Sequence, residues 1–393
     1  MKKIPYSKQN ISEEDIESVC SILRSDYLTQ GPVIENFEAR FRGLCGVNHA
    51  VATNSATSAL HLACLSLGVG AGDIVWTSPI TFVASANCAA YCGAYIDFVD
   101  IDPKSYNMSV EGLEKKLVEA EMSGKLPKVV IPVHMCGQPC EMAEIYRLAE
   151  RYGFSVIEDA SHAVGAAYRG SLVGSCEFSQ ITIFSFHPVK IITTGEGGMA
   201  VTNDTRLYSR MKVLRSHGIL RNGSEAAGRS NGPWFYDQVE LGFNFRMSDI
   251  HAALGISQLL RLNNFIQERR RLASVYDKLI PEGIAEVPWR HPDSYSTFHL
   301  YVIRLNLKAI KSSQKEVYEY LHSHGIFVQL HYIPVYRHSF YRSMGHSITS
   351  FPNAEDYYAR AVSLPLYPGL EPSEQQEIVQ QLIKSAGCES TQC

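Results

Sequence analysis

The sequence lacks any long apolar run, and it has no excess of positive charge. Its longest apolar stretches are strand-length and interrupted by polar residues, so no transmembrane helix is expected. The formal net charge is -4 over 393 residues. No basic surplus is therefore available to bind a polyphosphate backbone, which argues against nucleic-acid binding. The N-terminal MKKIPYSKQNISEED contains no apolar signal-peptide core, so we expect a cytoplasmic protein.

The cysteines also lack the spacing of a metal site or a disulfide framework. Ten cysteines are scattered along the chain, and two pairs, Cys88/Cys92 and Cys136/Cys140, have a C-x3-C spacing. Zinc sites usually use C-x2-C or C-x4-C pairs in sets of four ligands. In a reducing compartment these residues are expected to be thiols that pack as small apolar groups, with no metal bound.

The chain is long enough for one large domain and a smaller one, and its first half alternates between two kinds of pattern. Helical patterns cover Thr57–Leu67, Phe82–Tyr91, Val110–Ala120 and Ala143–Tyr152. Seven runs rich in Val, Ile, Phe and Tyr lie around them: Ala50–Thr53, Ile74–Thr77, Tyr95–Asp100, Val129–Val133, Ser155–Glu158, Ile181–Phe184 and Met199–Thr202. This alternation predicts an α/β domain with a seven-stranded, mostly parallel sheet.

The second half has a different order of elements. Asn222–Pro233 is rich in Gly, Ser and Asn and is expected to be a surface loop. A long helix is predicted from Ser248, as N-cap, to Leu279, followed by a strand over Ser294–Leu305. We therefore expect a large domain over residues 1–262 and a smaller α+β domain over residues 263–393.

A glycine-rich segment at Gly68, Gly70 and Gly72 raises the possibility of a dinucleotide-binding loop. Such a loop must follow a strand and open a helix, whereas these glycines follow a predicted helix and precede a strand. A turn after a helix C-cap is the better interpretation, and a nicotinamide-dependent dehydrogenase is disfavoured.

Chemically capable residues follow several of the predicted strands. Lys190 lies a few residues beyond the strand that ends at Phe184, and Asp159 ends a neighbouring strand. The segment 54–59, with its small and hydroxyl side chains, opens a helix and could bind phosphate through backbone N–H groups. Phe82 follows a fourth strand and could stack on a planar ring. Each feature alone has an ordinary explanation as a surface lysine, a helix cap or a core aromatic.

Their combination is more specific than any single residue. The carboxyl ends of parallel strands meet at one edge of the sheet, where ligands bind. A phosphate cradle, a stacking aromatic, a carboxylate for a pyridine nitrogen and a lysine are the parts that a pyridoxal 5'-phosphate (PLP) site requires. The sequence therefore predicts a PLP enzyme that carries its cofactor on Lys190.

From about residue 4 to 370, the chain resembles the DegT-type sugar-nucleotide aminotransferases, which are fold-type I PLP enzymes. Within that family it most resembles the branch that acts in pseudaminic acid biosynthesis. The motifs behind this resemblance are Leu28–Gly31, Asn54–Thr57, Pro79–Phe82, Ser185–Lys190, Thr193–Gly198, Arg215–Gly218, Gly242–Arg246 and His331–Pro334.

The resemblance implies a role for each matching position. Lys190 would carry the cofactor and move the proton, Asp159 would pair with the pyridine nitrogen, and His162 would lie near the ring oxygen O3′. Phe82 would stack on the ring. The cofactor phosphate would be bound by Ala56, Thr57 and Ser185, and by Asn244 of the neighbouring subunit in a homodimer with shared active sites. The nucleotide sugar would contact Tyr6, Asp26, Tyr27, Leu28, Thr29, His331, Tyr332, Ile333 and Pro334.

The resemblance also implies the reaction. The amino group of L-glutamate would pass to C4 of a UDP-linked 4-keto-6-deoxy-N-acetylhexosamine, giving UDP-4-amino-4,6-dideoxy-N-acetyl-β-L-altrosamine. Transfer to another keto sugar, dTDP- or GDP-linked or carrying a 3-keto group, is the main alternative. A dehydratase on the same scaffold would have histidine in place of Lys190. A non-catalytic binding protein would be expected to lack the lysine or the aspartate, and both are present.

Overall fold

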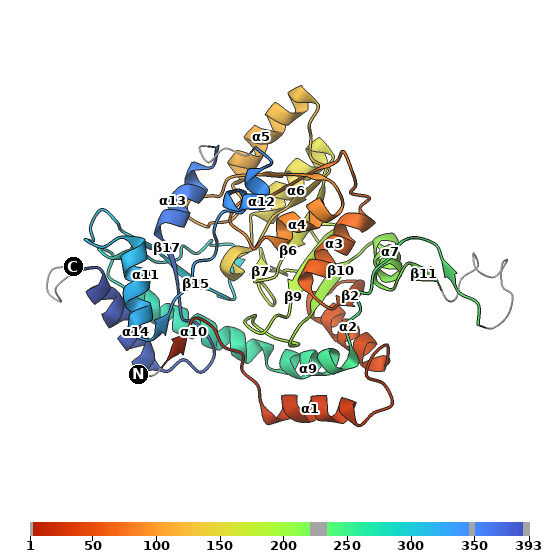
Figure 1. Cartoon of the computed structure of the whole chain (residues 1–393), viewed down its shortest axis with the longest axis horizontal. Coiled ribbons are helices and arrows are strands. Elements are labelled where there is room, and N and C mark those ends of the chain that lie inside the picture. Colours follow the sequence, from red (N-terminus) through yellow and green to blue (C-terminus); the bar gives the residue numbers. More distant parts are fainter. Residues whose placement is uncertain (1–2, 221–233, 346–349, 388–393) are drawn as a thin grey trace.

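The computed structural model describes residues 3–220, 234–345 and 350–387 (Figure 1). The predicted loop at Asn222–Pro233 lies outside these ranges. Within them, no helix is both long and apolar enough to cross a membrane.

A seven-stranded sheet forms the centre of the molecule, in the order β2-β10-β9-β6-β5-β3-β4. Only β10 runs antiparallel to its neighbours, so the predicted mostly parallel sheet is confirmed. The strands are β2 (His49–Thr53), β3 (Ile74–Thr77), β4 (Tyr95–Phe98), β5 (Val129–Ile131), β6 (Ser155–Asp159), β9 (Ile181–Ser185) and β10 (Gly198–Thr202).

Helices cover both faces of this sheet because successive strand side chains point to opposite sides. In β5, for example, Val129 and Ile131 belong to the core under α3 (Ala56–Ser66) and α4 (Ala84–Tyr91), together with Met211 and Leu214 of α7 (Thr205–Arg215). Val130 packs on the opposite face. That face is covered by α5 (Val110–Ser123) and α6 (Met142–Tyr152), and farther along by α2 (Pro32–Cys45) and α9 (Asp249–Leu260).

The C-terminal part of the chain builds a second core around a three-stranded antiparallel sheet, in the order β13-β15-β17. We call this part the C-terminal unit. Its elements are β13 (Ala285–Glu286), β15 (Tyr301–Leu305), α11 (Gln314–Ser323), β16 (Ile326–Phe327), β17 (Ala361–Leu364) and α14 (Pro372–Ser385). The N-terminal strand β1 (Ile4–Pro5) pairs with β16, and Ile4 is buried in this second core.

Shorter elements connect these layers. α1 (Glu13–Leu23) packs under α9 (Figure 1). The others are β7 (Ala167–Tyr168), β8 (Ser171–Leu172), β11 (Ile219–Leu220), β12 (Asp237–Gln238), β14 (Ser294–Tyr295), α12 (Ser339–Arg342), α13 (Pro352–Arg360), and the 3-10 turns η1 (Met135–Gly137) and η2 (Val335–Arg337).

Two of the predicted elements are wrong in their continuity. The helix expected over Ser248–Leu279 is divided at Arg261 into α9 and α10 (Leu262–Leu279), and Arg261 there pairs with the buried Asp15 of α1. The strand expected over Ser294–Leu305 is two strands in different sheets, because Phe298 between them has a positive φ of 48°. Ser248 does cap α9, as its hydroxyl accepts from the backbone N–H of His251.

The glycine-rich segment forms a turn, as the sequence analysis favoured. Gly68 directly follows the C-cap of α3 with φ of 74°, and the chain then enters β3. A positive φ at this place is easily adopted by glycine.

Candidate active site

A cavity of about 260 Å³ opens at the carboxyl ends of the central strands. Its walls come from the loops after β2, β3, β6 and β9 and from segments next to the C-terminal unit's strands. Among the residues that line it are Tyr6, Ala56, Thr57, Phe82, Asp159, His162, Ser185, Lys190, His299, His331 and Tyr332.

The start of α3 forms one end of the cavity. Ser55 caps this helix, its hydroxyl accepting from the backbone N–H of Ser58 at 3.1 Å. Gly198 permits the close approach of β10, because a Cβ there would lie 2.5 Å from the backbone N of Ala56. With Ser185 also lining the cavity at the end of β9, backbone N–H groups and hydroxyls gather at a helix N-terminus, which favours an anionic phosphate.

Asp159 ends β6 and is held in place by two donors. The hydroxyl of Ser85 donates to its Oδ2 at 2.6 Å, and the backbone N–H of Ser161 donates to its Oδ1 at 3.0 Å. The residue is buried at only 4% exposure, yet it lines the cavity. A carboxylate fixed in this way is suited to pair with a protonated ring nitrogen.

Lys190 lies in the turn after β9 and lines the same cavity. Burial lowers the pKa of the Lys190 amine to about 8, while the negative charge of Asp159 acts in the opposite direction. An amine with this pKa is partly neutral near physiological pH. It can therefore serve as a nucleophile or a general base, which an ordinary lysine does poorly.

Three histidines next to Lys190 carry no positive charge at neutral pH. Burial, followed by the charge of Lys190, lowers the pKa of His331 to about 3. Burial also lowers the pKa values of His162 and His299 well below the ordinary value, again with a contribution from Lys190. These three neighbours of the lysine are therefore neutral hydrogen-bonding groups.

Most predicted site residues meet in this cavity, but two groups do not line it among the described residues. The predicted cofactor ligands Ala56, Thr57, Phe82, Asp159, His162, Ser185 and Lys190 come together, with Tyr6, His331 and Tyr332 from the predicted substrate set. One group that does not line it is Asp26–Thr29, and the other is formed by Asn244, Ile333 and Pro334, which come from two separate segments.

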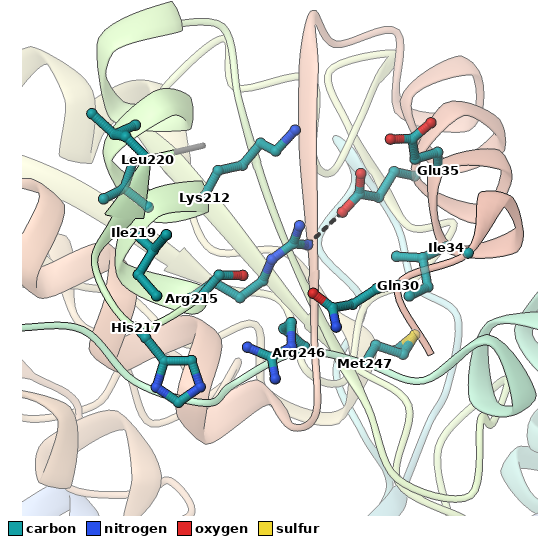
Figure 2. A pocket seen from close by; sticks show the side chains of 14 residues that line it. Gln30, Ile34, Glu35, Lys212, Arg215, His217, Ile219, Leu220, Arg246 and Met247 are labelled. Carbon is teal, nitrogen blue, oxygen red and sulfur yellow. Dashed lines mark hydrogen bonds and ion pairs between the residues drawn. The ribbon is translucent and has the colours of Figure 1, made fainter. Parts of the chain in front are cut away.

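A second, larger cavity of about 560 Å³ is lined by residues that follow Asp26–Thr29 and Asn244 in the chain (Figure 2). Gln30 and Gly31 line it directly after Asp26–Thr29, and Arg246 and Met247 line it just after Asn244. Figure 2 shows Lys212, Arg215 and Arg246 in its wall, with Arg215 bonded to Glu38 at 2.7 Å. Asp26–Thr29 and Asn244 are thus chain neighbours of residues that line the second cavity, whereas Ile333 and Pro334 line neither cavity.

Two residues that shape the first cavity, one behind its wall and one in its lining, were not predicted. Ser85 orients Asp159 from behind the lining and lies in the first turn of α4, where a serine carries no distinctive signal. His299 precedes β15 and reaches the cavity only because the C-terminal unit packs there. No sequence pattern could indicate that contact.

Residues 9–383 match the model of the DegT/DnrJ/EryC1/StrS aminotransferase family. The chain belongs to this family. The predicted resemblance is confirmed, and the arrangement of Lys190, Asp159 and the α3 cradle agrees with it. As a DegT/DnrJ/EryC1/StrS aminotransferase, the chain is a PLP-dependent sugar aminotransferase with the predicted α/β fold.

Individual relatives match along nearly the whole chain. The UDP-4-amino-4,6-dideoxy-N-acetyl-β-L-altrosamine transaminase of Campylobacter jejuni is 40% identical over 365 residues, covering 93% of this chain and 92% of the relative. The solved structure of Helicobacter pylori PseC, an aminotransferase involved in the biosynthesis of pseudoaminic acid, is 32% identical with a TM-score of 0.88, covering 98% of this chain and all of that one.

A third comparison bears on the cofactor. The PLP form of Spr1654 from Streptococcus pneumoniae has a TM-score of 0.87 and 27% identity, covering 98% of this chain and 99% of that one. The residues of this chain fit the same group. A helix N-terminus lies at one end of the cavity for a phosphate, and a fixed carboxylate and a partly neutral lysine line it with Phe82.

Proposed function

We propose that this enzyme transfers the amino group of L-glutamate to C4 of a UDP-linked 4-keto-6-deoxy-N-acetylhexosamine, giving UDP-4-amino-4,6-dideoxy-N-acetyl-β-L-altrosamine for pseudaminic acid biosynthesis. The relative of that name, 40% identical across 93% of the chain, carries the proposal. The likeness to Helicobacter pylori PseC supports it independently. The eight cysteines among the described residues are free thiols, which is compatible with the cytoplasm that the proposal assigns.

The proposal gives a role to five side chains of the first cavity. The N–H groups at the start of α3, with Thr57 and Ser185, would bind the cofactor phosphate. Asp159 would bind the pyridine nitrogen, and Phe82 would stack on the ring. Bound PLP supplies an electron sink for the negative charge that forms when a proton leaves the amino-acid α-carbon. Lys190 would move that proton, since its lowered pKa leaves the neutral amine available.

The homodimer with shared active sites is part of the same proposal. β11 and β12 form an arm that projects from the body (Figure 1), and on it Trp234 is 76% exposed and Leu241 is 83% exposed. Large apolar side chains this exposed favour burial against a second surface. In the dimer, the second cavity of one subunit, with Asn244 and Asp26–Thr29 beside it, would adjoin the cofactor cavity of the other.

Mixed dimers test the shared site. The Lys190→Ala chain keeps Asn244, and the Asn244→Ala chain keeps Lys190. If the site is shared, co-refolding the two variants restores one complete site per mixed dimer, so activity rises above the mean of the two parents. Activity equal to that mean contradicts sharing. Size-exclusion chromatography with light scattering measures the dimer itself, and a monomeric enzyme with full activity rules it out.

The substrate is tested by the second half-reaction alone. The enzyme is converted to its pyridoxamine phosphate form with glutamate, excess donor is removed, and keto nucleotide sugars are added one at a time while the cofactor absorbance is followed. The band is expected to return fastest with the UDP-linked 4-keto-6-deoxy-N-acetyl sugar of L-arabino configuration. Faster return with a dTDP-linked, GDP-linked or 3-keto sugar identifies another pathway. Failure of glutamate to bleach the band contradicts the amino donor.

A further inference from the structure

The ring of His162 is fixed by the backbone behind it. The N–H of Cys136 donates to His162 Nδ1 at 3.3 Å, from a turn in which Cys136 has a φ of 61°. The neighbouring Gly137 is packed tightly, since a Cβ on it would lie 2.8 Å from the carbonyl oxygen of His162. On its other side, His162 lies against His299 with ring centroids 4.5 Å apart. The imidazole therefore has little freedom to rotate or flip.

This contact also determines which nitrogen of His162 carries the proton. Nδ1 accepts a backbone N–H, so it cannot itself bear a hydrogen in that direction. Burial and the nearby charge of Lys190 hold the pKa of His162 well below the usual value, so the ring is neutral. A neutral ring whose Nδ1 is the acceptor must carry its hydrogen on Nε2.

The proton on Nε2 is already directed at another side chain. His162 Nε2 lies 3.1 Å from the hydroxyl of Tyr332, and Tyr332 must therefore accept this bond. The Tyr332 O–H is left to donate elsewhere, and the side chain lines the cofactor cavity. Burial raises the pKa of Tyr332, so its hydroxyl keeps its proton at neutral pH.

The position of Tyr332 is secured from the opposite side. The hydroxyl of Tyr357 donates to the carbonyl oxygen of His331 at 2.5 Å, and His331 Nδ1 bonds with the hydroxyl of Ser363 at 2.8 Å. These contacts attach the segment to α13 and to β17. Tyr332 thus presents one oriented O–H to the cavity beside Lys190.

The covalent structure of PLP limits which cofactor atom can accept a hydrogen bond from the Tyr332 hydroxyl. The ring carbon that bears O3′ is adjacent to the one whose substituent joins the lysine, and the pyridine nitrogen lies at the far side of the ring. A ring held between Lys190 and Asp159 therefore presents O3′ close to Lys190, where His162 and Tyr332 lie. The donor hydrogen of His162 is already directed at Tyr332, so His162 does not supply a donor to that oxygen.

We propose that the hydroxyl of Tyr332 donates to the cofactor oxygen O3′, with His162 as the positioning residue that orients it. The inference rests on the proposed placement of the cofactor between Lys190 and Asp159. It changes the role expected for His162 from a direct contact with O3′ to an indirect one, and it makes Tyr332 a cofactor ligand as well as a neighbour of the sugar.

The test is the pH titration of the absorbance of the PLP-loaded enzyme, without substrates. A donor to O3′ stabilises the form that has lost the proton shared with the Lys190 nitrogen, and so it lowers the titration midpoint. Tyr332→Phe is expected to raise the midpoint by about one pH unit or more, the size of a hydrogen bond to a charged oxygen. Circular dichroism and cofactor stoichiometry show that the variant is folded and loaded.

Three further variants separate the roles. His162→Leu removes the orienting donor and is expected to raise the midpoint by less than Tyr332→Phe does. His162→Gln keeps one acceptor and one donor, and it is expected to stay near the wild-type midpoint. Tyr6→Phe removes a hydroxyl from another residue of the same cavity, and it is expected to leave the midpoint unchanged.

Two results overturn the proposal. The first is an unchanged midpoint in Tyr332→Phe with a full shift in His162→Leu, which assigns O3′ to His162 directly. The second is an unchanged midpoint in Tyr332→Phe with a raised KM for the nucleotide sugar, which assigns the hydroxyl to the substrate. Neither result bears on the proposed reaction, because bleaching of the wild-type band by glutamate and its return with keto sugars test that reaction separately.

Discussion

The two sides of the cofactor cavity are built in different ways. On the strand-end side, Asp159, Ser185 and Lys190 lie at or just beyond the ends of central strands, and Ala56 opens the helix after β2. The opposite side, which we call the cover side, is formed by Tyr6, His299, His331 and Tyr332. These residues lie near β1 and near β15 and β16 of the C-terminal unit in the chain.

Because the two sides of the cavity are built differently, we expect the strand-end side to hold the cofactor and the cover side to select the sugar. The strand-end residues are attached to a sheet whose strand side chains are almost all buried, so their spacing is rigid. The cover residues come from separate connections, and such segments can change between relatives without disturbing the sheet. We therefore expect variants on the strand-end side to affect cofactor chemistry with every substrate, and variants on the cover side to affect the sugar more than glutamate.

Lys190→Ala should give the largest effect. Without the amine there is no group to hold the cofactor covalently or to move the proton, so kcat is expected to fall by about 10,000-fold or more in both half-reactions. Borohydride reduction followed by mass spectrometry should find no cofactor fixed to the chain. Lys128→Ala is the matched control. Lys128 pairs with Asp73 and precedes β5, at the opposite edge of the sheet, and this variant should keep wild-type rates.

Asp159→Asn should cause the next largest loss of kcat. The amide keeps the size of the side chain but loses the negative charge that would stabilise a protonated ring nitrogen, so kcat is expected to fall by about 100-fold or more. Steady-state rates with saturating cofactor measure this loss. A variant that retains more than half of the wild-type kcat would show that Asp159 does not support the cofactor chemistry expected of the strand-end side.

Loading of the cofactor should depend on pH through Lys190. Because burial lowers the pKa of this amine to about 8, the fraction of neutral amine falls about tenfold for each pH unit below that value. The rate constant for PLP uptake by the apoenzyme should rise up to about pH 8 and then level off, in stopped-flow absorbance. A small-molecule amine of ordinary pKa is the control. A profile parallel to that control would contradict the lowered pKa.

Gly198→Ala should have a moderate effect on stability and cofactor affinity. The new methyl group would approach the backbone of Ser55 and Ala56 to within 2.6 Å, and overpacking of this kind costs about 1–3 kcal/mol. Urea unfolding and PLP titration measure the two consequences. Gly43→Ala is the matched control, because it lies in α2 with no atom near the added Cβ, and it should be neutral or stabilising. Equal urea unfolding midpoints for Gly198→Ala and Gly43→Ala would contradict the expected overpacking at Gly198.

Tyr6→Phe should give the smallest effect and acts on the cover side. Loss of one hydrogen bond to the nucleotide sugar is worth about 1 kcal/mol, so KM for the sugar should rise about fivefold. The rate of the glutamate half-reaction should stay within about twofold of wild type. If glutamate is affected as strongly as the sugar, the functional division between the two sides is wrong.

Prediction from sequence was accurate where a local pattern determines the structure. All seven central strands were located within two residues at each end, because each combines a short apolar run with a following polar turn. Asp159 and Lys190 do line one cavity, as expected for residues at the carboxyl ends of parallel strands. Ser85 and His299 were missed, because their importance depends on which residue packs against them.

Local sequence also failed where a distant contact controls the backbone. Nothing between Ser248 and Leu279 interrupts the helical pattern, yet Arg261 leaves the helix where its side chain pairs with Asp15, far away in sequence. Phe298 similarly interrupts an apolar run that reads as a single strand. In both cases tertiary packing outweighed local propensity.

The sequence by itself determined the alternating α/β sheet, the lysine and the carboxylate at its edge, and the family motifs, because these depend on periodicity and on residues close together in the chain. Only the tertiary structure decided that Asp159 is held by Ser85, that His162 bonds with Tyr332, and that the residues after Asp26–Thr29 and Asn244 line a second cavity. The physical reason is that hydrogen bonds and burial join groups across 74 to 170 residues of chain, and no local pattern encodes such distances.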